Sequence, residues 1–288
     1  MEGLKASDIK YTASPFPRQI RLDSVNYCQA RCRFCHILQV DRPKAKMSLA
    51  KIEEIINEIA QWPQHPQEVV PVNYGEMLIH EQWFDILKLV EIKLPRTRIV
   101  LPTNGALLDW EKLRKLLTIK TLRLVNLSIN AAFDESYEAI MSLPASNIQR
   151  LRNIAARIRQ DRPDITVWAS MVHSSLWLTD LERDRFIEFW RDVAIPQVNS
   201  ATFCGNGEKP WRMVKEPCRS LFSDMVIGAD GKIGSCCYDV GFTHDLGQHP
   251  QDGTLLEIWN GPKFRVLREV HNAGKRGNIP ICAGCTFA

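Results

Sequence analysis

The chain has 288 residues, of which 45% are hydrophobic and 24% are charged, and its formal net charge is +4. This composition is typical of a globular protein with one large domain and a small one, or with two modest domains. Lysine and arginine are spread along the chain, so no nucleic-acid partner is expected. No apolar run approaches the roughly 20 residues that span a bilayer, and residues 1–11 are too polar for a signal peptide. We therefore expect no membrane partner and a cytoplasmic location.

Strand-like and helix-like segments alternate along most of the chain. Strands are expected at residues 18–25, 68–74, 98–103, 122–130, 165–172 and 198–204. Helices are expected at residues 48–62, 80–94, 109–117, 147–159 and 180–193. In the first helix, Ser48 is a good N-cap, and isoleucines at positions 52, 55, 56 and 59 follow the helical period. The alternation favours an α/β fold with parallel strands, and six units predict a partial (β/α)6 TIM-type barrel.

The alternation ends near Gly205. Residues 205–210, Gly-Asn-Gly-Glu-Lys-Pro, are typical of a linker. Beyond it, residues 225–227 and 232–234 flank an Asp-Gly hairpin signal, and a helix is expected at residues 254–270. The chain is thus divided into a barrel domain, residues 1–207, and a small C-terminal module with a β-hairpin and a helix, residues 208–288.

The nine cysteines carry most of the chemical information. A reducing compartment disfavours disulfides, so metal binding or catalysis is expected. Cys28, Cys32 and Cys35 lie in the loop after the first strand, where a parallel barrel builds its active site. Thiolates favour iron–sulfur clusters or zinc, and three of them leave one iron of a four-iron cluster open. The alternative is a zinc site that takes His36 as its fourth ligand.

A second constellation lies in the C-terminal module, where the last two cysteines have the chelating C-x-x-C spacing. On spacing alone, a structural zinc site and an iron–sulfur cluster are equal rivals. The four cysteines are Cys218, Cys236, Cys282 and Cys285.

The first cysteine motif, with Phe34 before its last cysteine, resembles the signature of the radical S-adenosylmethionine (SAM) superfamily. The resemblance implies that Cys28, Cys32 and Cys35 hold a [4Fe–4S] cluster whose open iron is chelated by the amino and carboxylate groups of SAM. It also implies that Phe34 lies against the adenine, although packing within the loop is equally compatible with the sequence.

Further segments resemble the same family. Gly75 and Glu76 match its Gly-Glu-Pro motif, with Met77 in place of the proline, and this segment is implied to bind the SAM amino group. Asn104 is also assigned to the SAM site. Ser128 and Asn130 resemble contacts to the ribose or carboxylate of SAM, with strand-end capping as the alternative.

The usual anchor of the SAM carboxylate is in question. Met141 stands where relatives often place an arginine, and Arg150 or Arg152 could substitute for it.

The C-terminal module resembles the SPASM and twitch subgroup of radical SAM enzymes. Because the given sequence ends at Ala288, the shorter twitch form is expected, with one auxiliary [4Fe–4S] cluster on the four module cysteines. Cys237 could instead be the ligand in place of Cys236. It could also donate a hydrogen atom to a substrate radical, or be a small buried hydrophobe. Cys204 is a lesser candidate for the donor.

The resemblance implies hydrogen abstraction by a 5′-deoxyadenosyl radical from a small polar substrate of the sugar or aminocyclitol type. Two-electron oxidation or epimerisation would follow, as in the radical SAM dehydrogenases and epimerases of aminoglycoside pathways. The alternatives are a peptide maturase and a non-enzymatic, zinc-stapled binding module. A flavodoxin or ferredoxin is the expected electron donor. Candidate proton acceptors and pocket-wall residues are His173, Glu208, Lys209, Trp211 and Arg212.

Overall fold

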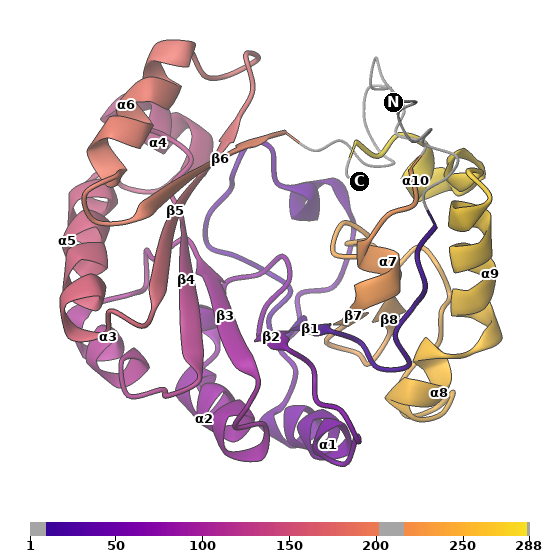
Figure 1. The fold of residues 1–288 in the computed structure, drawn as a ribbon. Coiled ribbons are helices and arrows are strands. Elements are labelled where there is room, and N and C mark those ends of the chain that lie inside the picture. The colour runs from indigo at the N-terminus through magenta and orange to yellow at the C-terminus, as the bar shows by residue number, and fades with distance from the viewer. Residues whose placement is uncertain (1–9, 202–215, 287–288) are drawn as a thin grey trace, which may run out of the picture.

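The structure is a computed structural model that describes residues 10–201 and 216–286. A curved, open sheet runs through these residues with the strand order β6-β5-β4-β3-β2-β1-β7-β8 (Figure 1). Strands β1 to β7 pair in parallel, and β8 pairs antiparallel with β7. The strands are β1 (Gln19–Leu22), β2 (Glu68–Val70), β3 (Arg98–Thr103), β4 (Leu122–Ser128), β5 (Thr166–His173), β6 (Ile195–Ser200), β7 (Asp224–Ile227) and β8 (Ile233–Gly234).

Helices of the barrel follow the outer side of this sheet, whereas those of the module pack beside β7 and β8 (Figure 1). The barrel helices are α1 (Leu49–Ala60), α2 (Trp83–Lys93), α3 (Trp110–Leu116), α4 (Asp134–Met141), α5 (Ser146–Asp161) and α6 (Asp180–Trp190). The module helices are α7 (Ser220–Ser223), α8 (Leu255–Trp259), α9 (Pro262–Asn272) and α10 (Pro280–Ala283). Short 3-10 helices are η2 (His36–Gln39), η3 (Met77–Ile79) and η4 (Arg276–Asn278). No helix among the described residues combines the length and the apolar character needed to cross a bilayer.

The predicted partial barrel is confirmed, and α1 shows why the sequence was informative. The Ser48 hydroxyl accepts a hydrogen bond from the Lys51 backbone N–H at 3.2 Å and so begins the helix. The isoleucines at the predicted periodic positions are fully buried; they are Ile52, Ile55, Ile56 and Ile59. Burial of one such side chain stabilises the fold by roughly 1.5–3 kcal/mol.

Several predicted elements have other bounds in the structure; for example, β2 ends at Val70 rather than at residue 74. The single helix expected at residues 254–270 is two helices, because Pro262 lacks a backbone N–H and lies in the first turn of α9. The last barrel strand begins at Ile195, three residues before its expected start, and its predicted end at Cys204 lies outside the described residues. The boundary drawn at residue 207 also lies outside them.

The module hairpin continues the barrel sheet. β7 lies in parallel register with β1, from Gln19 opposite Asp224 to Leu22 opposite Ile227. β1 therefore has hydrogen-bonded neighbours on both sides, β2 and β7. This pairing fixes the module next to the loop that follows β1.

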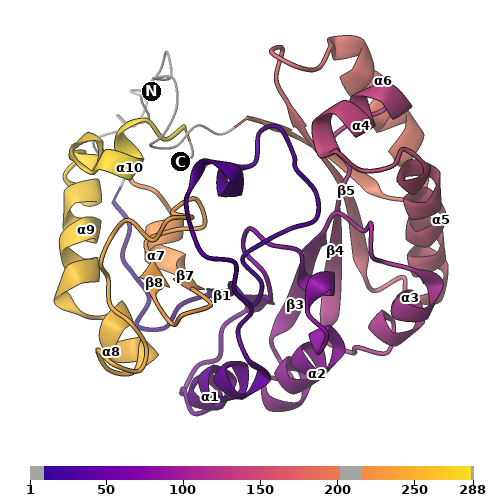
Figure 2. The same ribbon diagram turned by 180° about the vertical axis from the view of Figure 1, so that it is seen from behind.

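The long loop between β1 and α1 arches across the open face of the sheet, between the module and β3 to β5 (Figure 2). Arg42 ties this loop to its surroundings. Its guanidinium lies 3.1 Å from the buried Asp23 carboxylate, donates to the Val240 carbonyl at 2.8 Å, and stacks 4.6 Å above the Phe242 ring. The loop is thus held at its base and against the module.

Candidate active site

The three cysteines of the first motif line one cavity at the carboxyl ends of the barrel strands. Its open space is about 920 Å³ and reaches solvent. Strands β2 to β6 and the loops that follow them supply the other walls. The lining includes Cys28, Cys32, Phe34, Cys35, Asn73, Tyr74, Gly75, Glu76, Thr103, Asn104, Asn126, Ser128, Asn130, Met141, Ser170 and Asn199. The three cysteines and the residues assigned to SAM from the family motifs are therefore brought together.

The cysteine loop is docked on the end of α4. The backbone N–H groups of Arg31 and Arg33 donate to the carbonyls of Met141 and Ile140, at 3.1 and 2.9 Å. Carbonyls in the last turn of a helix have no partner within the helix, so they are available to orient such a loop.

The thiols have the chemistry of cluster ligands. Burial, with repulsion from neighbouring groups, raises the pKa of Cys28 to about 11 and that of Cys32 to about 12. Burial also raises the pKa of Cys35. Such thiols lose their protons readily only when a cation binds the sulfur, as iron does. Three clustered sulfur donors at an open cavity fit a four-iron cluster with one free iron.

Glu76 is buried, and its carboxylate connects two strand ends. Its oxygens accept hydrogen bonds from the Leu78 N–H, the Thr103 hydroxyl and the Asn104 N–H, at 3.1, 2.9 and 2.8 Å. Burial raises its pKa, although these donors oppose the rise. The carboxylate thus positions the β3 loop.

Gly75 allows the motif after β2 to pass close to the cysteine loop. A Cβ atom at this position would lie 1.8 Å from the carbonyl oxygen of Val25. The next N–H, that of Glu76, donates to the Tyr27 carbonyl at 3.1 Å. Glycine is therefore required by this close approach.

Ser128 and Asn130 lie at the end of β4, as predicted. Asn130 has a left-handed backbone, with φ of 64°, and its side chain joins two neighbouring segments. Its Oδ1 accepts from the Val172 N–H at 2.9 Å, and its Nδ2 lies 3.2 Å from the Met141 sulfur. That sulfur is also 3.4 Å from the Cys32 sulfur. Met141 therefore occupies the space beside the cysteines.

The two proposed substitutes for the carboxylate anchor lie elsewhere. Arg150 donates to the Gly105 carbonyl at 2.9 Å and to the Asn147 side chain at 2.6 Å. Arg152 donates to the Phe189 carbonyl at 3.0 Å. Neither is among the residues that line the barrel cavity, because both are bound to helices and loops outside it.

The Phe34 ring stacks on Trp177, with 6.0 Å between ring centroids and 24° between planes. The sequence did not single out Trp177. The sequence shows only that an aromatic residue lies just beyond the carboxyl end of β5. Its contact with the Phe34 ring depends on how distant segments pack, and no local pattern indicates it.

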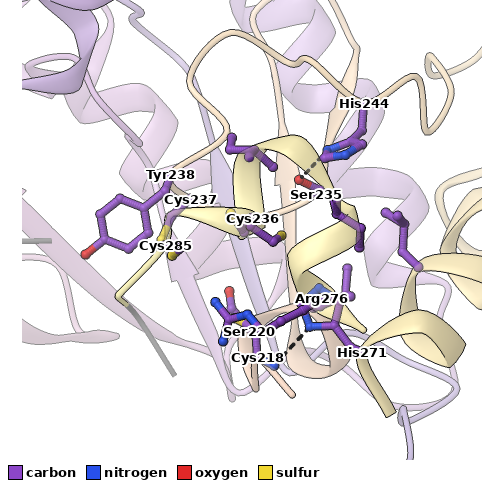
Figure 3. A pocket seen from close by; sticks show the side chains of 15 residues that line it. Cys218, Ser220, Ser235, Cys236, Cys237, Tyr238, His244, His271, Arg276 and Cys285 are labelled. Atoms are coloured by element: carbon purple, nitrogen blue, oxygen red, sulfur yellow. Dashed lines mark hydrogen bonds between the residues drawn. The ribbon is translucent and has the colours of Figure 1, made fainter. Parts of the chain in front are cut away.

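The module contains a second, small cavity that is lined by five cysteines (Figure 3). They are Cys218, Cys236, Cys237, Cys282 and Cys285. Burial raises the pKa of Cys282 to about 12 and that of Cys237 to about 11. These five cysteines can supply the four thiolate ligands of one cluster, and one cysteine then remains without a ligand role.

His271 orients the first of these cysteines and was not singled out from the sequence. The Cys218 backbone N–H donates to its Nδ1 at 3.1 Å. Burial, with the charge of Arg276, lowers the pKa of His271 to about 4. The ring is therefore neutral and can accept this hydrogen bond.

The two cavities share a wall. Asn73, which lines the barrel cavity, donates from Nδ2 to the Cys237 carbonyl at 3.2 Å. The Cys237 side chain itself lines the module cavity. Beside it, the His36 ring lies edge-on to Tyr74 and Tyr238, with centroids 5.8 and 5.7 Å away. His36 thus belongs to an aromatic group between the cavities.

The other residues considered as proton acceptors, pocket-wall residues or hydrogen-atom donors add little to the site. His173 lies 3.3 Å from the Thr179 carbonyl and 3.7 Å from Asp180. Within residues 10–201 and 216–286, no three histidine, cysteine or acidic side chains converge as ligands of a single metal ion. Outside the described residues lie Cys204, Glu208, Lys209, Trp211 and Arg212.

Comparisons with known proteins agree with this site. The family model of the radical SAM superfamily matches residues 23–173, and that of an iron–sulfur cluster-binding domain, SPASM, matches residues 218–286. No curated protein matches the chain.

Solved structures share the fold over nearly the whole chain. BtrN in complex with AdoMet and 2-DOIA is 16% identical, with a TM-score of 0.67 over 94% of this chain and 93% of that one. The AdoMet-bound anSMEcpe structure is 16% identical, with a TM-score of 0.68 over 93% and 85%. SuiB of Streptococcus suis, bound to the precursor peptide SuiA, is 14% identical, with a TM-score of 0.67 over 89% and 67%.

These findings imply SAM and iron–sulfur clusters as cofactors, and the zinc-stapled, non-enzymatic module is therefore wrong. The three solved structures share the fold of this chain, a partial barrel followed by a C-terminal module. The chain belongs to the radical SAM superfamily.

Proposed function

We propose that this enzyme removes a hydrogen atom from one C–H bond of a small, hydroxyl-rich substrate of the sugar or cyclitol type and oxidises it by two electrons. SAM on the reduced first cluster, held by Cys28, Cys32 and Cys35, supplies the abstracting chemistry. The substrate then loses one proton and one electron, so that C–OH becomes C=O. Cys218, Cys236, Cys282 and Cys285 would hold an auxiliary cluster, which would supply an acceptor for the electron.

The proposal rests on which polar groups of the barrel cavity are free to bind a ligand. On the β2–β3 side, Glu76, Thr103 and Asn104 are hydrogen-bonded to one another or to the cysteine loop. Their polar atoms therefore build the cluster site and are not available to a substrate.

On the β4–β6 side of the barrel cavity, by contrast, polar groups are able to bind a ligand. The Ser170 hydroxyl donates to Oδ1 of Asn126, which leaves Nδ2 of Asn126 to face the cavity. Within the described part of the chain, no side-chain hydrogen bond engages this Nδ2, the Ser128 hydroxyl or the Asn199 amide. These neutral donors and acceptors match hydroxyl groups. Ser128 is proposed for SAM, and Asn126 and Asn199 are proposed for the substrate.

Glu76 is the only carboxylate among the described lining residues, and its oxygens are already engaged. This supports a substrate recognised through hydroxyl groups. The 2-DOIA ligand of BtrN is a small molecule bound to a protein of this fold, which favours the same substrate class.

Epimerisation is the second candidate, because Asn73 holds the Cys237 backbone at the wall between the cavities. A thiol there could return a hydrogen atom to the substrate radical. The placement of the Cys237 side chain in the module cavity favours oxidation as the first candidate. We further propose a flavodoxin or ferredoxin as the one-electron donor.

The first experiment counts clusters and tests SAM cleavage. Anaerobically reconstituted protein is expected to hold about eight irons with matching sulfide. Cys32→Ala and Cys282→Ala should each lose about half of the iron, and each serves as the control for the other. Only Cys32→Ala should abolish 5′-deoxyadenosine formation with dithionite. Zinc without sulfide would contradict the proposal.

The second experiment identifies the substrate class and the outcome. Neutral cyclitols and hexoses, 2-deoxystreptamine, and a short peptide are compared for stimulation of 5′-deoxyadenosine formation in ²H₂O. A carbonyl product from a hydroxyl-rich compound supports oxidation. Deuterium at the reacting carbon supports epimerisation, and stimulation by the peptide alone supports a maturase, the activity suggested by the peptide-bound SuiB structure.

A further inference from the structure

Arg276 is a buried cation in the wall of the module cavity. It belongs to η4, its side chain is 1% exposed, and it lines the cavity together with the cysteines. Its guanidinium donates to the Glu216 carbonyl at 3.0 Å, next to the start of the module. Figure 3 shows it beside Cys218 and His271.

The charge of Arg276 acts on cysteines from two distant segments. Burial raises the pKa of Cys218 and of Cys282, and the guanidinium opposes that rise at both sulfurs. His271 lies on the same side but is neutral, since burial lowers its pKa to about 4. Arg276 is therefore the positive charge that these two sulfurs share.

Other charged groups lie near the module cysteines but are not among the residues that line the cavity. The buried Asp239 accepts hydrogen bonds from Ser235 and Thr243, and its charge acts on Cys236 and Cys282. Arg21 and Asp224, of opposite sign, both act on Cys237. Arg276 and Asp239 thus bring opposite charges to the module cysteines, and both act on Cys282.

A cluster becomes more negative when it gains an electron, so a fixed positive charge nearby favours the reduced state. The effect is large where water is excluded, because the interaction is poorly screened. Net charge and hydrogen bonding around a cluster are among the factors that set its reduction potential.

We infer that Arg276 raises the reduction potential of the auxiliary cluster and so enables it to accept the electron from the substrate. Arg276 acts through the cluster and is a positioning residue rather than a catalytic one. This inference rests on the proposed function, in which the module cysteines hold the cluster.

The test is an EPR-monitored redox titration of full-length, reconstituted protein in which Cys28, Cys32 and Cys35 are replaced by alanine, so that the auxiliary cluster alone gives the signal. Arg276→Gln and Arg276→Met should shift the midpoint to lower potential, and Arg276→Lys should stay near the parent. Asp239→Asn should shift it upward. Arg185→Gln, on the exposed face of α6, is the control and should leave it unchanged.

An iron-replete Arg276→Gln or Arg276→Met protein with the parent potential would overturn the inference. If both neutral variants fail to retain iron while Arg276→Lys retains it, the requirement for positive charge is supported. If all three variants lose iron, the role is purely structural and the inference is wrong. A shifted potential in an enzyme that makes no oxidised product would refute the proposed oxidation and leave the effect of Arg276 on the reduction potential standing.

Discussion

The side-chain amide of Asn104 donates a hydrogen bond to the sulfur of Cys28, with 3.2 Å between Nδ2 and Sγ. Its Oδ1 accepts from the Gln29 side chain at 2.8 Å and from the Ala106 N–H at 3.0 Å. The amide is therefore held in one orientation, and it connects the end of β3 to the first cysteine of the loop. Its backbone N–H is in turn bound by Glu76.

Asn104→Ala should weaken the first cluster. Outer contacts of this kind commonly contribute about 10-fold or more to metal affinity, and hydrogen bonds to sulfur raise the potential of a cluster. We expect about 10-fold faster loss of iron to a chelator and a lower midpoint in an EPR-monitored titration. Asn153→Ala, on the exposed face of α5, is the control. Unchanged iron loss in Asn104→Ala would contradict this role of the amide.

Gly75→Ala should destabilise the fold, because its Cβ atom would lie 1.8 Å from the Val25 carbonyl oxygen. Forcing an atom into such a close approach costs roughly 1–3 kcal/mol or more. The measurement is the free energy of unfolding of the metal-free protein in urea.

Gly274→Ala is the matched control for that change. Gly274 has φ of 68°, but a Cβ atom added there would meet no atom within 4 Å, so only backbone strain of about 1 kcal/mol is expected. Equal losses of stability at the two positions would show that the contact with Val25 is unimportant.

The stability of the protein should depend on pH through Asp23. Burial raises the pKa of this carboxyl from 3.8 to about 6, although Arg42 opposes part of the rise. The folded state thus binds the proton more tightly than the unfolded chain does, and stability falls as the pH rises from about 4 to above 6. The change corresponds to about 3 kcal/mol.

Asp23→Asn removes this ionisation. Relative to the wild type, its free energy of unfolding should rise by about 3 kcal/mol between pH 4 and pH 7. Asp164→Asn is the control, because the exposed Asp164 pairs with Arg162 and its pKa is lowered to about 2. The stability that this ion pair contributes is lost only below pH 4. The difference in free energy of unfolding between Asp164→Asn and the wild type should therefore stay constant between pH 4 and pH 7. The prediction would be refuted if the difference in free energy of unfolding between Asp23→Asn and the wild type did not change with pH.

Glu58 joins the barrel to the module. Its two oxygens bind Nε2 of the buried His249 and the backbone N–H of Leu255, each at 2.7 Å. Glu58→Ala leaves both groups without this partner. The change should lower the free energy of unfolding by about 2–3 kcal/mol and increase proteolysis of the module. Glu53→Ala, exposed on the same helix, should have no effect on either measurement. Equal behaviour of the two variants would show that the contact does not hold the module.

Much of the architecture was predictable because its signals are local. The periodic isoleucines of α1, the alternation of strands and helices and the Asp-Gly hairpin each depend on a few neighbouring residues. The helix expected at residues 254–270 was wrong, since hydrophobic periodicity outweighed the break that Pro262 imposes. The pairing of β7 with β1 joins segments about 200 residues apart, and no local pattern encodes it.

In the site, too, some features follow from local sequence patterns and others from the packing of distant segments. Cysteine spacing and the Gly75-Glu76 motif identified the chemistry, because Cys28, Cys32 and Cys35 lie within eight residues and the last two module cysteines form a C-x-x-C pair. The sequence by itself therefore determined the superfamily, the two cysteine constellations and the strand ends that surround the first. Only the tertiary structure decided that Asn104 holds Cys28, that Arg150 and Arg152 lie outside the cavity, and that Arg276 faces the module cysteines. Those contacts depend on how distant segments pack, which sequence spacing does not contain.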